Sequence, residues 1–143
     1  MRFSFEFEPN LSSADENTIY QGLLAHNVED LGLPLEEIST KPFAFVVRID
    51  GAVKAGLVGN IKYRSAFVDT LWVDKSLRKQ GVGRKLLTQA EEHAAKNSCN
   101  VIFLNTLSPA NVSFYEKSGY VFEFERKDYL GGYPMRYFRK SLG

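Results

Sequence analysis

The 143-residue sequence has little of what several classes of protein require. It contains one cysteine, Cys99, and two histidines, His26 and His93, which is too few ligands for a structural zinc site. A single cysteine also excludes a disulfide framework within the chain and fits a reducing compartment. The N-terminal residues 1–10 alternate apolar with polar side chains, so we expect neither a signal peptide nor a membrane span there. We therefore expect a soluble, cytoplasmic protein.

An excess of charge of one sign is also missing. Eighteen Lys and Arg residues face 17 Asp and Glu residues, and the formal net charge is +1. The chain as a whole has no electrostatic field to hold nucleic acid or cations, so any charged ligand must be bound by a local cluster. The content of 44% hydrophobic and 24% charged residues is that of a globular protein, and the length suits a single domain of residues 1–143.

The hydrophobic periodicity predicts an α/β fold. Alternation at Phe3, Phe5 and Phe7 predicts a half-buried first strand, and Asp50-Gly51 is a strong signal for a hairpin turn. Further strands are predicted near residues 43–49, 52–63, 66–73, 101–104, 120–126 and 134–140, and helices near 14–31, 81–96 and 109–117. We expect one layered α/β structure with a mixed sheet.

The turn at residues 78–84 has the properties of an anion-binding site. A predicted buried strand enters a turn that contains Gly81 and Gly83, and the turn opens an amphipathic helix. Glycines let an anion approach the backbone, and the first N–H groups of a helix have no partners within the helix. The spacing fits neither the P-loop nor the dinucleotide fingerprint, which requires a small residue where Leu86 stands. A solvated basic turn remains the alternative interpretation.

Two spaced motifs connect this turn to a known family. The pattern Arg78-x-x-Gly81-x-Gly83, with Leu71-x-Val73 before it, resembles the signature of the GNAT superfamily of acyl-CoA-dependent N-acyltransferases. Residues 111–120 are similar to the family's second motif, although the position of the asparagine is shifted. Residues 128–140 are similar to a bacterial subgroup of uncharacterised substrate. The predicted order of elements also resembles the GNAT fold over essentially the whole chain.

The resemblance implies a mostly antiparallel sheet, flanked by helices and splayed between the fourth and fifth strands, residues 66–73 and 101–104. It implies acetyl-CoA as co-substrate, with no metal. Backbone N–H groups of the turn would hold the pyrophosphate, and the strand edge would pair with pantetheine. The implied cofactor-binding residues are Leu71, Trp72, Val73, Arg78, Lys79, Gln80, Gly81, Val82, Gly83, Arg84 and Asn111.

The resemblance also implies a general acid, Tyr115, which would protonate the departing CoA thiolate. A tyrosine with a reference pKa of about 10 keeps its proton at neutral pH. The family's glutamate base falls on Phe67, which cannot accept a proton, and Asp69 on the same face of the strand is the candidate that replaces it. A buried aromatic residue and an exposed aspartate are the alternative interpretations of Tyr115 and Asp69.

The expected reaction is direct acyl transfer from acetyl-CoA to an amine of a small molecule or protein. Cys99 has no neighbouring base in the sequence, so we expect a buried apolar role for it and not a nucleophile. A non-catalytic acyl-CoA sensor remains an alternative. A weaker one is a protein or nucleic-acid interaction module that uses residues 78–85 with Arg136, Arg139 and Lys140. Homodimers through the C-terminal strands are common in the family.

Overall fold

The computed structural model describes residues 1–143, which divide into two compact units, residues 1–39 and 40–143. The first unit contains α1 (Ser13–Leu31) and the short α2 (Leu35–Ile38). The hydroxyl oxygen of Ser12 accepts a 3.1 Å hydrogen bond from the Asp15 N–H and caps the start of α1. Gly32 ends α1 in the left-handed conformation, at φ 66°. The predicted helix at 14–31 is therefore confirmed.

The predicted first strand at residues 3–7 is wrong. Residues 1–8 belong to no strand, and the side chains of Phe3, Phe5 and Phe7 are 74%, 93% and 90% exposed. An alternating pattern gives a strand only where its backbone N–H and C=O groups meet those of a neighbouring strand. No strand of the structure pairs with these residues, so the alternation does not produce β-structure.

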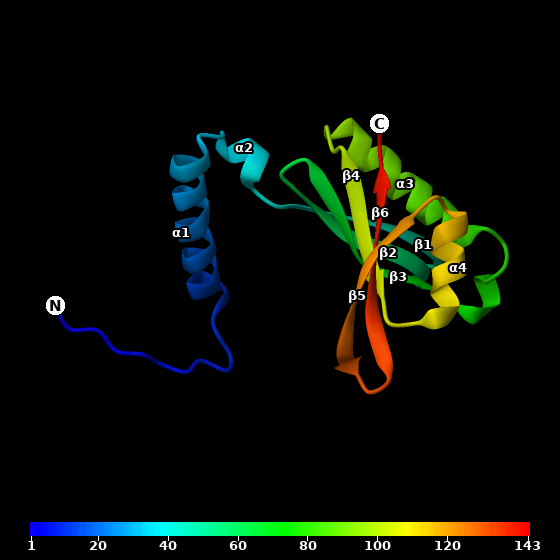
Figure 1. Ribbon diagram of the computed structural model, residues 1–143, viewed down its shortest axis with the longest axis horizontal. Coiled ribbons are helices and arrows are strands. Elements are labelled where there is room, and N and C mark those ends of the chain that lie inside the picture. Colours follow the sequence, from blue (N-terminus) through cyan, green and yellow to red (C-terminus); the bar gives the residue numbers. More distant parts are fainter. The chain divides into compact units, whose positions relative to one another are not determined.

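The second unit is built on one six-stranded sheet (Figure 1). Its strands lie in the order β1-β2-β3-β4-β6-β5, and only β3 and β4 run parallel. The strands are β1 (Lys41–Ile49), β2 (Ala52–Lys62), β3 (Ser65–Val73), β4 (Val101–Thr106), β5 (Val121–Leu130) and β6 (Tyr133–Ser141). Asp50-Gly51 forms the predicted turn between β1 and β2. No helix of the chain is long and apolar enough to cross a membrane.

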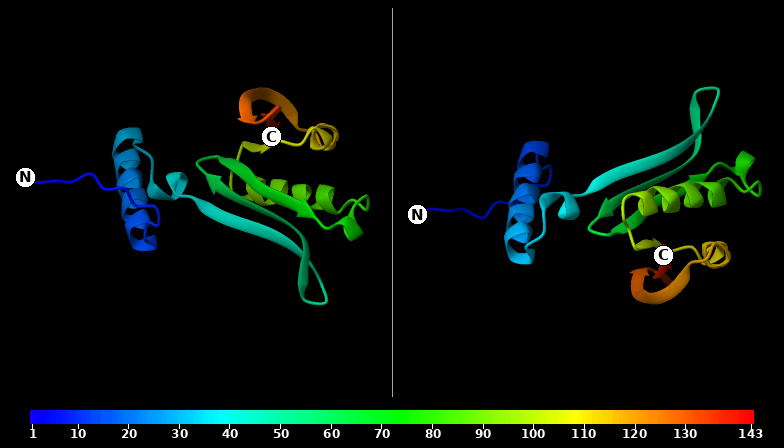
Figure 2. Two further views of the ribbon diagram at one scale, coloured as in Figure 1. Left: turned by 90° about the horizontal axis from the view of Figure 1, so that it is seen from below. Right: turned by 90° about the horizontal axis from the view of Figure 1, so that it is seen from above.

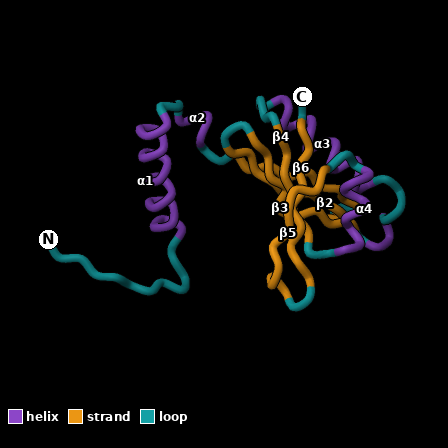
Figure 3. Tube along the Cα trace, in the orientation of Figure 1, coloured by secondary structure: helices purple, strands orange, loops and turns teal.

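Two helices of the second unit pack on this sheet, α3 (Val82–Lys96) and α4 (Pro109–Lys117) (Figure 3). The apolar residues of α3 recur at the spacing of one helix face, and Leu86 and Leu87 are almost fully buried. Burying a leucine side chain stabilises a fold by about 1.5–3 kcal/mol. Both helices contribute to one core cluster, which also includes Ile102, Leu104 and Phe138. The predicted helices at 81–96 and 109–117 are confirmed.

The sheet forks between β3 and β4. These strands pair only from Ser65↔Val101 to Val68↔Leu104, so β3 continues from Asp69 to Val73 without β4 beside it. The fork starts at a β-bulge: Val68 pairs with Gly59 and Thr70 with Val58, which leaves Asp69 without an opposite residue on β2. The splay that the sequence motifs implied is therefore present, between the third and fourth strands of the structure because the predicted first strand is missing.

Candidate functional site

A groove of about 860 Å³ lies at the fork. Its walls come from the end of β3, the turn that leads into α3, and α4 from Ala110 to Tyr115, and Figure 2 shows α4 and the start of α3 at the same end of the sheet. The lining residues are Leu71, Trp72, Val73, Leu77, Arg78, Lys79, Gly81, Val82, Gly83, Arg84, Ser108, Ala110, Asn111, Phe114 and Tyr115. The structure therefore brings the two sequence motifs together around one cavity.

The turn before α3 is fixed by local hydrogen bonds. A carboxylate oxygen of Asp74 accepts from the N–H of Ser76 at 3.0 Å and from its hydroxyl at 2.6 Å. These bonds hold the pKa of Asp74 below its usual value. Arg78 Nε donates to the Val73 carbonyl oxygen at 3.0 Å and so ties the turn to the end of β3. These contacts within the chain define the shape of the turn.

The start of α3 leaves its backbone N–H groups available. Gly81 is the N-cap at φ 79°, with no side-chain capping bond, and the first helical hydrogen bond runs from the Lys85 N–H to the Gly81 carbonyl. The preceding Lys79 also has a positive φ, of 61°. Arg78, Lys79 and Arg84 line the same end of the groove. Unpaired N–H groups, the helix dipole and these cations together favour an anion.

A close approach between α3 and α4 narrows the groove behind this turn. A Cβ atom placed on Gly83 would lie 3.2 Å from Cζ of Phe114 and 3.7 Å from Cγ2 of Val73. Most real Cβ contacts are longer than 3.2 Å, so only a glycine lets the first turn of α3 sit this near the Phe114 ring. The turn that opens α3 and the helix that carries Tyr115 are therefore in direct contact.

The side wall of the groove is the end of β3, which pairs with β2 but not with β4. Leu71 and Val73 are partly buried against the core, whereas Trp72 is 46% exposed. Because β4 does not pair with this segment, one edge of its backbone remains open to a ligand. Such an edge can accept an extended polar chain as an added strand.

Tyr115 also lines the groove. It is 6% exposed, and its ring contacts those of Phe114, Tyr120 and Phe138. Burial raises the pKa of the Tyr115 hydroxyl above its ordinary value. The hydroxyl therefore keeps its proton across the neutral pH range, as a general acid must.

The first turn of α4 is held by Thr106, which the sequence analysis did not single out. The Thr106 hydroxyl oxygen accepts from the Ser108 N–H at 3.1 Å and from Asn111 Nδ2 at 3.4 Å. Ser108, Ala110, Leu77 and Phe114 also line the groove without having been predicted. Pro109 at the first helical position was the available signal that Ser108 and Ala110 would lie at a helix start.

Two of the predicted site residues do not line the groove. Gln80 turns its side chain back to the Ser76 carbonyl, to which Nε2 donates at 3.1 Å. Asp69 is exposed at the bulge, where its carboxylate accepts a 3.4 Å hydrogen bond from Asn60 Nδ2. Asn60 lies on β2 directly opposite Phe67. Through its bond to Asn60, the Asp69 carboxylate therefore lies next to the position where the family's glutamate base would be.

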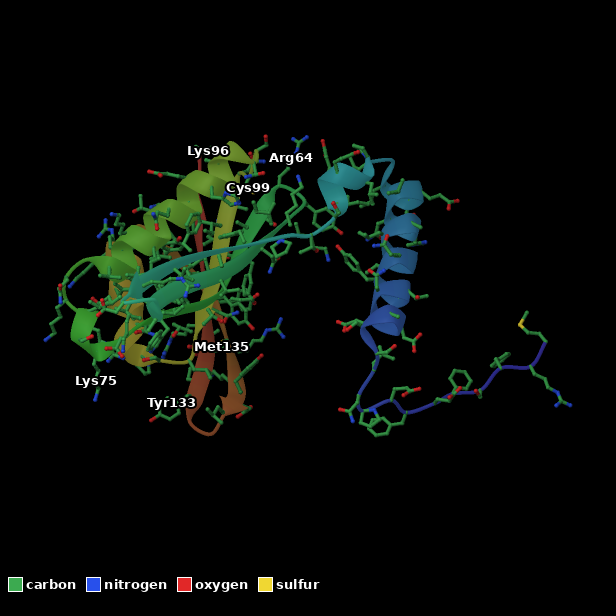
Figure 4. All side chains as sticks on the ribbon, turned by 180° about the vertical axis from the view of Figure 1, so that it is seen from behind. Arg64, Lys75, Lys96, Cys99, Tyr133 and Met135 are labelled. Atoms are coloured by element: carbon green, nitrogen blue, oxygen red, sulfur yellow. The ribbon has the colours of Figure 1, made fainter.

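Cys99 lies far from the groove. It follows the C-terminal end of α3, whereas the groove is at the N-terminal end of this 15-residue helix, roughly 22 Å away at 1.5 Å per residue. Figure 4 shows Cys99 near Lys96 and at the opposite end of the helix from Lys75. Cys99 is 5% exposed, and burial raises the pKa of its thiol. A low-pKa nucleophile is therefore not found there.

The buried tyrosines predict a loss of stability at high pH. The unfolded chain ionises its tyrosines near pH 10, whereas burial, and for Tyr120 also the neighbouring Glu91 carboxylate, raises the pKa values of Tyr115 and Tyr120 in the folded chain. Above about pH 10 the unfolded state therefore binds fewer protons, and the free energy of unfolding falls. Thermal unfolding followed by circular dichroism should show this fall, and Tyr120→Phe should make it less steep. Equal falls in both proteins would contradict this explanation.

The forked sheet, the open edge of β3 and the basic, uncapped start of α3 are the features expected of an acyl-CoA-dependent transferase. Comparison with known proteins then identifies the family. Residues 11–120 match the acetyltransferase (GNAT) family. The chain is 32% identical over 106 residues to an acetyltransferase of Agrobacterium fabrum, covering 73% of this chain and 74% of that protein. It is 31% identical over 93 residues to the blasticidin-S acetyltransferase of Streptomyces morookaense, covering 64% and 68% of the two chains.

The fold agrees with this result. A crystal structure of an acetyltransferase from Agrobacterium tumefaciens superposes with a TM-score of 0.84 at 26% identity, over 97% of this chain and 99% of that chain. The chain therefore belongs to the acetyltransferase (GNAT) family and is an acetyl-CoA-dependent N-acetyltransferase. The family and the mixed sheet that the sequence motifs predicted are confirmed.

Proposed function

We propose that this protein transfers the acetyl group of acetyl-CoA directly to an amine of a small-molecule acceptor while both substrates are bound. The observation that carries the proposal is a single groove that is lined both by the start of α3 and by the buried Tyr115. One end suits a pyrophosphate and the other suits a leaving thiolate. The open edge of β3 between them can hold an extended chain of amides.

In this arrangement the pyrophosphate lies against the backbone N–H groups of residues 80–84, with Arg78, Lys79 and Arg84 as its counter-charges. The pantetheine arm pairs with the β3 edge from Leu71 to Val73, and backbone N–H groups there polarise the thioester carbonyl. As the amine attacks that carbonyl, the C–S bond breaks, and Tyr115 gives its proton to the sulfur.

Asp69 is the proposed base, since an amine with a lysine-like pKa of about 10.4 must lose a proton before it can attack. Its exposed position at the fork, outside the acyl-CoA groove, supports access from the acceptor side, directly or through a water. We expect Asp69→Asn to lower kcat by about 100-fold at neutral pH while leaving acetyl-CoA affinity unchanged. Asp50→Asn, in the exposed turn between β1 and β2, is the matched control. An unchanged kcat in Asp69→Asn would assign the base elsewhere.

Direct transfer is supported by the position of Cys99. A route through an acyl-enzyme needs an accessible nucleophile in the groove. The one thiol of the chain is buried at the far end of α3, and none of the groove residues is a cysteine.

The acceptor class is supported by a relative. The protein of Streptomyces morookaense acts, by its name, on blasticidin S, a small molecule.

The charges of the C-terminal basic residues do not favour the alternative of a nucleic-acid or protein interaction module. Arg136 pairs with Glu125 at 3.5 Å and Lys140 pairs with Glu91 at 2.8 Å, so these two charges are largely compensated.

Calorimetric titration with acetyl-CoA, with desulfo-CoA and ATP as comparison ligands, tests the groove. Micromolar binding of acetyl-CoA without binding of ATP is expected. A panel of amines that includes blasticidin S then tests transfer, through release of the CoA thiol. Binding without transfer to any amine would favour the sensor alternative, and no binding of acetyl-CoA by a folded sample would overturn the assignment of the groove.

Three further expectations belong to this proposal. The family match runs through the boundary at residue 39, which supports a single domain of residues 1–143. The edge strand β5 is exposed along its whole length, which supports a homodimer through the C-terminal strands. The free Cys99 thiol supports a cytoplasmic location.

A further inference from the structure

Three side chains that are distant in the sequence meet behind the groove. The Glu91 carboxylate of α3 accepts a 2.9 Å hydrogen bond from the Tyr120 hydroxyl and a 2.8 Å bond from Lys140 Nζ of β6. Lys140 Nζ also lies 5.7 Å from the centre of the Tyr120 ring. The Glu91 side chain is 15% exposed and that of Lys140 is 30% exposed, so the pair is partly shielded from water.

This cluster holds the end of α4, the helix that carries Tyr115. Lys140 Nζ donates to the Ser118 carbonyl at 3.0 Å. The N–H groups of Ser118 and Tyr120 in turn donate to the Tyr115 carbonyl at 3.1 Å and 3.0 Å. The Tyr115 ring then rests against the rings of Tyr120 and Phe138, each with its centre 6.1 Å away. Both the backbone and the ring of Tyr115 are therefore fixed by neighbours of the cluster.

The same cluster is attached to the anion-binding turn. Glu91 belongs to α3, and the first turn of α3 is the proposed pyrophosphate site, roughly 14 Å along the same helix. A rigid helix thus connects Glu91 to the residues that would hold one end of acetyl-CoA, while Lys140 and Tyr120 connect it to α4. The distance between the bound thioester and the Tyr115 hydroxyl depends on how these two helices are held together.

Stability alone does not require charged residues here. A partly buried ion pair loses hydration, and replacement by apolar residues of similar volume is often neutral for stability. Hydrogen bonds between charged groups are instead directional, and they fix the relative position of the elements that they join.

We propose that Glu91, Lys140 and Tyr120 form a positioning clamp that sets the Tyr115 hydroxyl against the thioester end of the groove. The inference rests on the proposed role of Tyr115 as general acid. None of the three lines the groove, so they act through Tyr115 and the geometry of α3 and α4. A displacement of about 1 Å in a reacting group can cost up to about 100-fold in rate, so a loosened clamp has a measurable effect.

The first test compares Glu91→Gln and Tyr120→Phe with Glu92→Gln. Glu92 is the adjacent, exposed residue of α3, so its variant carries the same change of charge on the same helix without touching the clamp. CoA thiol release from acetyl-CoA is measured with the amine that reacts fastest in the panel, and calorimetry measures acetyl-CoA affinity. We expect kcat to fall about tenfold in Glu91→Gln and Tyr120→Phe, with unchanged acetyl-CoA affinity, and to stay at the wild-type value in Glu92→Gln.

The second test places Glu91→Gln in a Tyr115→Phe background. If the clamp acts through the Tyr115 hydroxyl, removing that hydroxyl first makes the Glu91 change cost little more. A further tenfold loss in the double variant would overturn the proposal, and so would a wild-type kcat in Glu91→Gln. A wild-type kcat in Tyr115→Phe would instead remove the general acid itself, which separates failure of the proposed function from failure of the clamp.

Folding is checked by circular dichroism and by hydrogen exchange at the amides of residues 118 and 120, whose N–H groups bond to the Tyr115 carbonyl. These amides should exchange faster in Glu91→Gln than in Glu92→Gln. If Glu91→Gln fails to fold, Tyr120→Phe decides the question, since it removes only one hydroxyl and keeps the ring that contacts Tyr115. Wild-type kcat in a folded Tyr120→Phe would then overturn the clamp.

Discussion

Replacement of Tyr115 by phenylalanine should lower kcat by about 100-fold or more and leave the affinity for acetyl-CoA nearly unchanged. The reason is the location of the hydroxyl. It belongs to a residue that lines the groove and is 6% exposed, and burial raises the pKa of this hydroxyl so that it is protonated when the thiolate leaves. Phenylalanine keeps the ring contacts with Phe114, Tyr120 and Phe138 and loses only the proton donor. Steady-state kinetics of CoA thiol release would measure the effect.

Tyr63→Phe is the matched control for this experiment. It removes a tyrosine hydroxyl from the turn between β2 and β3, outside the groove. We expect wild-type kcat in that variant. If Tyr115→Phe also turned over at the wild-type rate, another group would protonate the thiolate, and Tyr115 would be a packing residue.

Gly81→Glu should weaken acetyl-CoA binding by more than about 100-fold. A glutamate side chain brings a negative charge to the point where the unpaired N–H groups of Val82, Gly83 and Arg84 meet the pyrophosphate in our proposal. No atom lies within 4 Å of a Cβ placed on Gly81, so the substitution does not clash with the protein itself. Calorimetric titration with acetyl-CoA would measure the loss.

The strain of a side chain at a positive φ has to be separated from the effect of charge. Gly81 has φ 79° and Gly51 has φ 81°, and a Cβ on either residue meets open space. Gly51→Glu therefore introduces a comparable backbone strain and the same charge in the turn between β1 and β2. We expect it to bind acetyl-CoA like the wild type. If Gly81→Glu bound acetyl-CoA with the affinity of the wild type, the pyrophosphate would not lie at this turn.

Local patterns were sufficient for most elements of the fold. The spacing of Leu86, Leu87, Ala90 and Ala94 gave α3, and Asp50-Gly51 gave the first hairpin, because both depend on residues close in sequence. The alternation of Phe3, Phe5 and Phe7 failed because a strand also needs a partner, and pairing is decided by residues far along the chain.

The groove was predictable where a motif fixed the backbone. Gly81, Gly83 and Asn111, which the two motifs predicted as cofactor-binding residues, line the groove near the starts of α3 and α4. The bulge at Asp69 was not predictable, because it is defined by the register of β3 against β2. The contacts of Glu91 with Tyr120 and Lys140 could not be predicted from local patterns either, because these partners lie 29 and 49 residues away in the sequence.

The short pairing between β3 and β4 has a consequence for the lifetime of the protein. Only the pairs from Ser65↔Val101 to Val68↔Leu104 join the two halves of the sheet, and the groove beyond them is lined by the end of β3, the start of α3 and α4. In our proposal acetyl-CoA in the groove contacts all three elements, and it binds only the folded chain. At a free concentration of about one hundred times Kd, such binding adds about 2.7 kcal/mol to the free energy of unfolding. Resistance to proteolysis, and with it the abundance of the enzyme, would then rise and fall with the supply of acetyl-CoA.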